Sequence, residues 1–251
     1  MNIREIQVIP IVGFPIIQEG DDLSELLLSS LDTIGLEIQP GDILVVSHSI
    51  VSIAEGSVYS IADIIPSMKA KKLAIKLQRS AAYIEAVLQE ASEVIRESPV
   101  LITRTKQGII TDFSGIDESN APRGKFVTMP RDPDTSAKKL SMNLSRVLGF
   151  NIPVVITDTQ GRPWRKGAVN LAIGVAGMSP FDKNAGKTDI YHKRLRSSLV
   201  CLADELAASA ELVMGQADER VPLAIIRGVG IGDSNGSAQE ILRDKSNNLF
   251  S

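Results

Sequence analysis

The fold is organised around residues 152–167, which read IPVVITDTQGRPWRKG. Residues 152–156 are apolar and mostly β-branched, so they predict a short buried strand. This strand would deliver Asp158 and Thr159 to its carboxyl end. A carboxylate and a hydroxyl at such a place suit a hard divalent cation. The stretch therefore predicts a metal site at a strand end.

Three cations, Arg162, Arg165 and Lys166, follow between two glycines. Cations so close to a metal site suit the phosphates or carboxylates of a nucleotide-dependent reaction on an acidic substrate. The alternative is a surface turn with a solvated basic run. Residue types alone leave both interpretations open, although loops at strand ends often carry function.

The composition indicates an ordinary globular chain. Its 251 residues suffice for one large domain or two small lobes with a substantial core. Aromatic residues make up only 4%, so aliphatic side chains must fill that core. The net charge of -3 argues against a nucleic-acid partner. The single cysteine, Cys201, excludes a disulfide framework and is expected to be a buried structural thiol in a helix.

No apolar run approaches the roughly 18–20 residues of a membrane span, and the first residues lack the apolar segment of a signal peptide. We therefore expect a cytoplasmic enzyme with no membrane partner.

Hydrophobic periodicity predicts an α+β fold of mixed sheets with flanking helices. The expected strands cover residues 6–12, 42–47, 152–156, 169–177 and 221–227, with a hairpin of 100–104 and 108–111. The expected helices cover residues 22–31, 68–97 in two parts, 136–148 and 195–215. We treat residues 1–251 as one unit, because the sequence marks no clean boundary. We expect this unit to consist of two interleaved lobes.

Two glycine patterns match nucleotide-binding motifs only in part. Residues 185–188, AGKT, resemble the end of a Walker loop, but Phe181 occupies the place of its first glycine. The glycines at 228, 230 and 232 follow a strand, but Asp233 stands where a dinucleotide fingerprint needs its third glycine. No Walker-type phosphate loop is therefore expected.

With only His48 and His192, a histidine-rich zinc site is not expected, and a structural hydrogen-bonding role is the safer interpretation of His48. Asp117 also follows a predicted strand, with Asn120 near it. Carboxylates, a hydroxyl and substrate phosphates are the usual shell of Mg²⁺ or Mn²⁺, provided that Asp117 and Asp158 converge.

The chain resembles the coenzyme F-420-0:L-glutamate ligases, the gamma-glutamyl ligases of a deazaflavin cofactor, over nearly its whole length. The resemblance is carried by ordered blocks: GFPI at 13–16, GDILVV at 41–46 with AEG at 54–56, GIDESN at 115–120, ITDTQGR at 156–162, AIGVAG at 172–177, and ADELA at 203–207 through LVMG at 212–215.

The resemblance implies a GTP-dependent, amide-forming ligase that uses Mg²⁺ or Mn²⁺, often with K⁺, and forms homodimers of two-lobed subunits. GTP would phosphorylate the terminal carboxylate of the lactyl-phospho-deazaflavin F-420-0. The amine of L-glutamate would then attack the acyl phosphate, releasing phosphate.

Matched positions imply the site residues. Asp117, Asp158 and Thr159 resemble the metal ligands. The GTP surface would comprise Phe14, Pro15, Ile16, Ile17, His48, Ser49, Asn120, Met214, Gly215, Gln216, Ala217, Asp218, Glu219, Arg220 and Val221. We add Arg162 and Arg165 as catalytic cations that offset charge on the transferring phosphoryl group.

One departure concerns Ile53, which stands where the family usually has a lysine of the nucleotide surface. A lost cation should weaken phosphate binding, and a protonated His48 would compensate in part. Two alternatives therefore stay open: a gamma-glutamyl ligase on another acceptor such as a folate, and a nucleotide-binding regulatory protein without catalysis.

Overall fold

A mixed five-stranded sheet forms the centre of the molecule. The computed structural model describes residues 5–119, 121–232 and 234–249. The strands lie in the order β1 (Gln7–Pro10), β12 (Leu223–Arg227), β2 (Ile43–Ser47), β8 (Val154–Arg162) and β9 (Arg165–Ala176). Strands β2 and β8 are parallel, and the other neighbouring pairs are antiparallel.

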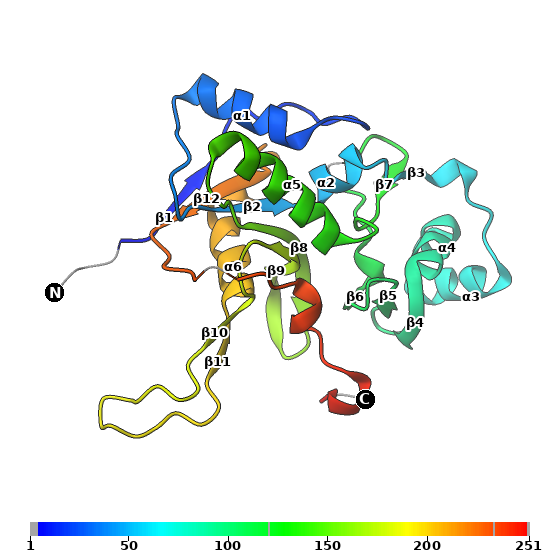
Figure 1. Cartoon of the computed structure of the whole chain (residues 1–251). Helices are drawn as coiled ribbons and strands as arrows, with labels where there is room; N and C mark the ends of the chain where they lie inside the picture. The colour runs from blue at the N-terminus through cyan, green and yellow to red at the C-terminus, as the bar shows by residue number, and fades with distance from the viewer. Residues whose placement is uncertain (1–4, 120, 233, 250–251) are drawn as a thin grey trace.

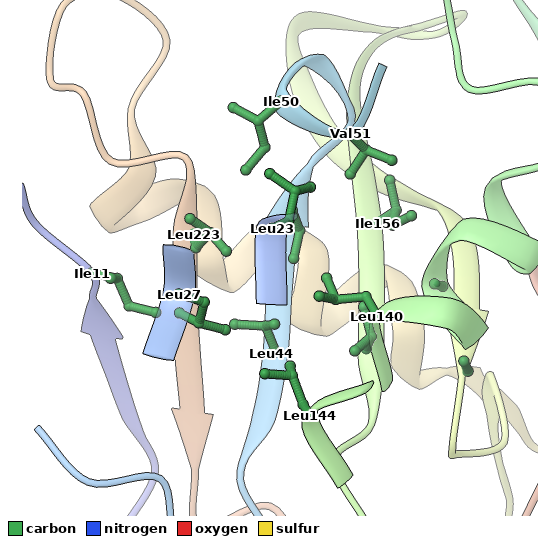
Figure 2. Packing of buried hydrophobic residues seen from close by; sticks show 14 of the residues in the cluster. Ile11, Leu23, Leu27, Leu44, Ile50, Val51, Leu140, Leu144, Ile156 and Leu223 are labelled. Carbon is green, nitrogen blue, oxygen red and sulfur yellow. The ribbon is translucent and has the colours of Figure 1, made fainter. Parts of the chain in front are cut away.

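Both faces of this sheet are covered, which explains why its strands are apolar without alternation. On one face, Leu44 and Val46 of β2 pack with residues of α1 (Leu23–Ile34) and α5 (Pro133–Leu148). Figure 2 shows this packing, with Leu27 and Leu140 meeting the strands. On the other face, Ile43 and Val45 pack with α6 (Leu202–Met214). We name the sheet and these three helices the central-sheet region.

Side-chain caps fix the beginnings of two helices: α1 begins within one residue of the prediction, whereas α5 begins three residues before the predicted Ser136. Asp22 accepts hydrogen bonds from the backbone N–H groups of Ser24 and Glu25, and it caps α1. Asp132 caps α5 through the backbone N–H of Thr135, with a proline in the first helical turn. These contacts satisfy donors that a helix leaves unpaired at its first turn.

A second, smaller core surrounds α3 (Met68–Leu77) and α4 (Ala81–Glu90), at the right of Figure 1. Strands β4 (Ala91–Arg96), β5 (Ile102–Thr105) and β6 (Ile110–Asp112) form a separate antiparallel sheet beside these helices. We name these five elements, with residues 78–80 and 113–117, the α3–α4 region. The predicted hairpin is confirmed, but the helix predicted to residue 97 is wrong beyond Glu90, because residues 91–96 pair with β5 instead.

The helix predicted from residue 195 is also corrected. Residues 199–201 form β11 (Leu199–Cys201), which pairs with β10 (Phe181–Lys183), and α6 begins only at Leu202. Cys201 is therefore the residue before α6 and is only partly buried, and this burial raises the pKa of its thiol to about 12. Figure 1 shows the chain between β10 and β11 projecting as a long yellow loop. Residues 185–188 lie in this loop rather than between a strand and a helix, unlike a Walker loop.

The remaining elements are short. They are α2 (His48–Ala54), the antiparallel pair β3 (Val58–Ser60) and β7 (Lys125–Val127), and the 3-10 turns η1 (Ile61–Asp63), η2 (Phe113–Gly115), η3 (Ala238–Ile241) and η4 (Lys245–Asn247). The mixed helices and sheets confirm the predicted α+β class, whereas the division into two lobes stays a prediction. No helix in the described part of the chain combines the length and apolar character that a membrane crossing requires.

Candidate active site

A cavity of about 770 Å³ opens at the carboxyl end of β2. Its lining comes from the central-sheet region, through Ser47, Asp158 and the loop after α6, and from the α3–α4 region, through Arg79 and Asp112. A volume of this size falls in the range of small-molecule sites, roughly 300–1,000 Å³. The cavity is therefore the first place to look for the predicted residues.

Asp158 lies within β8 rather than at its end, which corrects the sequence prediction. The strand continues to Arg162 because residues 157–162 pair with β9 in a hairpin. Opposite Ile156 and Thr157 the register shifts, with Ile173 left as the extra residue of β9. Such bulges bend a strand and re-aim its side chains, and they are frequent beside active sites. A bulge therefore lies directly beside the predicted metal ligand.

The Asp158 carboxylate is held at one oxygen and open at the other. Its Oδ1 accepts a hydrogen bond from the backbone N–H of Thr159 at 2.8 Å and lies 3.2 Å from Nε2 of His48. Its Oδ2 is buried and has no hydrogen-bond partner. A Cβ on Gly115 would lie 3.3 Å from this Oδ2 and 2.3 Å from the Met129 side chain, so glycine at φ +62° lets the chain pass close to the open oxygen.

His48 begins α2 and is only 4% exposed. Burial lowers the pKa of its imidazole, but the charge and hydrogen bond of Asp158, with the charge of Asp117, outweigh burial and raise the pKa above its ordinary value. The structural hydrogen-bonding role predicted for His48 is thus present, and its partner is the predicted metal ligand.

Asp117 approaches the same cavity from the segment after η2. Its backbone N–H and C=O pair with Val127, which anchors it to the edge of β7. Its Oδ1 accepts hydrogen bonds from the backbone N–H and the hydroxyl of Ser119, at 2.7 and 2.6 Å. Asp117 and Asp158 therefore line one cavity although they are 41 residues apart in the chain.

Thr159 contacts two side chains that also line the cavity. Its Oγ1 lies 2.7 Å from Oδ1 of Asn170 and 2.9 Å from Oε1 of Gln216. A hydroxyl has one proton and can donate to only one of these oxygens, so its lone pairs stay available. This contact joins β8, β9 and the loop after α6 at the centre of the site.

The predicted GTP surface is brought together almost entirely. Phe14 to Ile17, His48, Ser49, Met214 to Ala217 and Glu219 to Val221 all line the cavity. Asp218 is not part of the lining, and Asn120 lies outside the described residues. Ile53, the departure from the family pattern, also lines the cavity. GTP binding by these residues stays a prediction.

Arg162 and Arg165 lie farther along the β8–β9 hairpin and do not line the cavity. The Arg162 guanidinium donates to the backbone carbonyls of Lys166 and Gly167, so it closes the hairpin turn. The catalytic role of these two arginines stays a prediction that the cavity lining does not support.

Among the lining residues that sequence reasoning missed are Asn170, Arg79, Tyr83 and Phe113. Asn170 lies in an apolar strand, where an isolated amide was the available signal. The other three occur in a segment that reads as helix and hairpin, and no local pattern distinguishes them from core residues.

The residues fit a divalent cation in part. Within the described ranges, no three or more His, Cys, Asp and Glu side chains gather as a metal cluster. Two carboxylates, a hydroxyl and the oxygens of water and phosphate are nevertheless how Mg²⁺ is usually held. The open, buried Oδ2 of Asp158 is the observation that favours such a cation, because an unpaired buried carboxylate oxygen is otherwise unfavourable.

Comparison with known proteins places this chain in a family. Residues 12–228 match the family model described as F420-0:Gamma-glutamyl ligase. The chain is 42% identical to the coenzyme F420:L-glutamate ligase of Methanothermobacter thermautotrophicus over 98% of both chains. It is 36% identical to the protein of that name from Archaeoglobus fulgidus, over 98% of this chain and 96% of the relative. A third such protein, from Methanopyrus kandleri, is 40% identical over 93% of each chain. The chain therefore belongs to the F420-0:gamma-glutamyl ligase family.

Proposed function

We propose that this chain uses GTP to join L-glutamate, through an amide bond, to the deazaflavin cofactor precursor F420-0. Family membership supports the acceptor and the amino acid, since the relatives carry the name coenzyme F420:L-glutamate ligase. The observation that carries the nucleotide-dependent chemistry is the open Oδ2 of Asp158, buried in the cavity that also contains Asp117.

The reaction has two steps. A carboxylate oxygen of the acceptor attacks the γ-phosphorus of GTP, the bond to the bridging oxygen breaks, and GDP leaves. The amine of L-glutamate then attacks the acyl carbon, the bond to the phosphate oxygen breaks, and the amine gives up one proton as the amide forms. No nucleophilic side chain is needed, which agrees with the absence of Cys201 from the cavity lining.

The protein's contribution is to position charged groups. Asp158, Asp117 and Thr159 would hold Mg²⁺ or Mn²⁺, whose charge offsets that of the transferring phosphoryl group. Residues 214–217 and 219–221, with Phe14 to Ile17, would surround the nucleotide without a Walker loop. K⁺ as a second cation and a homodimer complete the proposal, as the family resemblance implies.

The test is product formation by the purified full chain. It is incubated with GTP, MnCl₂, KCl, L-glutamate and F420-0, and products are measured by mass spectrometry. We expect a product with one or more added glutamates, with release of GDP and phosphate that depends on both L-glutamate and F420-0.

Two other outcomes would change the proposal. Product formed only when F420-0 is replaced by a folate would indicate a different acceptor. GTP binding with no glutamyl product on any acceptor would favour a regulatory protein, which Ile53 in the cavity lining would then help to explain.

A further inference from the structure

Arg79 is a cation in the cavity wall that the predicted site does not include. It follows α3, whose last turn ends at Gln78 in a left-handed conformation, and its backbone N–H donates to the carbonyl of Ala74. Its side chain reaches the cavity lining. Within the described ranges, no carboxylate lies at ion-pair distance from its guanidinium.

Two aromatic rings hold the guanidinium in place. Its Cζ lies 5.4 Å from the centroid of the Phe113 ring and 5.8 Å from that of the Tyr83 ring. A guanidinium over an aromatic face is attracted to the ring and keeps its N–H donors at its edge. The five donors of Arg79 are therefore oriented and available to a ligand.

The rings themselves are fixed. Tyr83 is buried, and its hydroxyl donates to the carbonyl of Ile116. Phe113 and Ser114 both have positive φ, 47° and 56°, and Ser114 donates to the carbonyl of Val87 at 2.9 Å. Non-glycine residues in this conformation persist only where the surroundings hold them, often at functional sites. The same segment leads directly to Asp117. One turn therefore positions both the Phe113 ring that contacts Arg79 and a predicted metal ligand.

Charge in the cavity is divided between its two sides. In the described part of the chain, the basic side chains that line the cavity are Arg79, His48 and Arg220. His48 contacts Asp158, and Arg220 belongs to the loop after α6, which is part of the predicted GTP surface. Arg79 alone comes from the α3–α4 region, where Asp112 and Asp117 are the neighbouring acidic groups of the lining.

We propose that Arg79 is a specificity-determining residue that binds an oxyanion of a non-nucleotide substrate. The ligand group is either a carboxylate of L-glutamate or the phosphate or carboxylate of the acceptor. This inference rests on the proposed ligase function, because only that function supplies these substrates.

The test compares Arg79→Gln and Arg79→Lys with wild type and with Lys72→Gln, an exposed cation of α3 outside the cavity lining. KM is measured for each of the three substrates in turn. Loss of a hydrogen-bonded charged contact should raise KM for glutamate or for F420-0 by about 10- to 100-fold in Arg79→Gln. The KM for GTP and kcat should stay within about twofold. A contact that binds one substrate equally in the ground state and in the transition state affects only the KM for that substrate. Arg79→Lys should retain part of the affinity, and Lys72→Gln should match wild type.

Three results would overturn the proposal: unchanged KM values for both glutamate and F420-0, a rise confined to GTP, or an equal rise for all three with a lowered melting temperature. If Arg79 only neutralises Asp112 and Asp117, the variant would bind Mn²⁺ more tightly in titration calorimetry, with unaltered substrate KM values.

Calorimetric titration of glutamate and of F420-0 into the wild type and Arg79→Gln separates this inference from the proposed function. Absence of glutamyl product from the wild type refutes the ligase function. Equal binding of both ligands by wild type and variant refutes the role of Arg79.

Discussion

The two sides of the cavity are built differently. The central-sheet region places Asp158 in a strand whose neighbours are buried on both faces, and its Oδ1 is fixed by two contacts. The α3–α4 region places Asp117 directly after the positive-φ residues 113–115, and the Phe113 ring of this turn also contacts the Arg79 guanidinium. One predicted metal ligand thus comes from the central sheet, and the other from a segment that follows a turn and pairs with β7. The geometry of the cavity depends on how the two regions meet.

The largest expected effect tests the sheet side of this comparison. Asp158→Asn keeps the shape of the side chain but removes the charge that would hold a divalent cation. We expect kcat to fall by about 1,000-fold, equivalent to roughly 4 kcal/mol of lost transition-state stabilisation. Steady-state assays of GDP release measure the loss, and Mn²⁺ titration should show weaker binding.

Asp63→Asn is the matched control, because Asp63 is an exposed carboxylate of η1 outside the cavity lining. Comparable activity of Asp158→Asn and wild type would show that the metal assignment is wrong.

The next effect contrasts ion pairs of the two regions. Asp42 is 1% exposed and accepts from both Nε and Nη2 of Arg227, at 2.8 and 2.7 Å, joining β2 to β12. Asp42→Asn should lower the free energy of unfolding by about 3 kcal/mol, since it leaves a partly buried cation without its charge partner. Urea denaturation followed by circular dichroism gives the value.

The Lys76–Glu97 pair of the α3–α4 region is about half exposed at both side chains. Glu97→Gln should therefore change the free energy of unfolding by less than about 1 kcal/mol. Equal losses for the two variants would contradict the expectation that burial decides how much each ion pair contributes to stability.

A smaller effect concerns Ile53 on the nucleotide side. Ile53→Lys introduces a cation into the cavity lining, where a phosphate is expected. GTP should bind about tenfold more tightly, because a new charge-assisted contact contributes roughly 1.4 kcal/mol. Titration calorimetry against Ile53→Met, which adds length without charge, isolates the contribution of charge. If the lysine variant binds no better than the methionine variant, residue 53 does not face the nucleotide.

The smallest effect is a pH dependence of the central-sheet region. The backbone N–H of Thr135, followed by its hydroxyl, lowers the pKa of Asp132 at the beginning of α5. A carboxyl whose pKa is lower in the folded state stabilises the protein above its unfolded pKa of about 3.9, and this stabilisation is lost as the pH falls through the folded pKa.

Asp132→Asn keeps the cap but removes its charge, so it should be less stable than wild type by about 0.5–1 kcal/mol at pH 7. Thermal melts should show this difference shrinking as the pH falls below the unfolded pKa, and disappearing once the pH is below the lower folded pKa. The control Asp32→Asn removes a carboxylate from the last turn of α1, where its charge is unfavourable, so its effect should be zero or of opposite sign. Equal stability of Asp132→Asn and wild type at pH 7 would show that the cap acts through geometry alone, and a difference that does not change with pH would show that the carboxylate charge is not its cause.

Most of the central-sheet region could be predicted because its signals are local. Continuous apolar runs such as residues 43–46 predict strands buried on both faces, and Asp22 marks the beginning of α1 through its own hydrogen bonds. The helix expected at 136–148 begins earlier, because Asp132 was not recognised as its cap. The α3–α4 region was predicted less well. Residues 91–96 suit a helix as well as a strand, and pairing with β5 decided between them.

The candidate site follows the same division. Sequence identified Asp117, Asp158, Thr159 and nearly all residues of the nucleotide surface that line the cavity, mainly through family resemblance. It misplaced Asp158 at a strand end, because the hairpin that extends β8 depends on pairing with β9. It placed Arg162 and Arg165 beside that end, whereas the extended hairpin carries them beyond the cavity lining.

The sequence by itself determined the apolar strands of the central sheet, the beginning of α1 and the oxygen ligands available for a metal. These depend on residue type and on spacing along a few turns of chain. Only the tertiary structure decided that Asp117 and Asp158 share a cavity, that one oxygen of Asp158 stays open, and that Arg79 lies over Tyr83 and Phe113. Such contacts join residues far apart in the chain, and they are fixed by sheet order, bulges and core packing rather than by any local pattern.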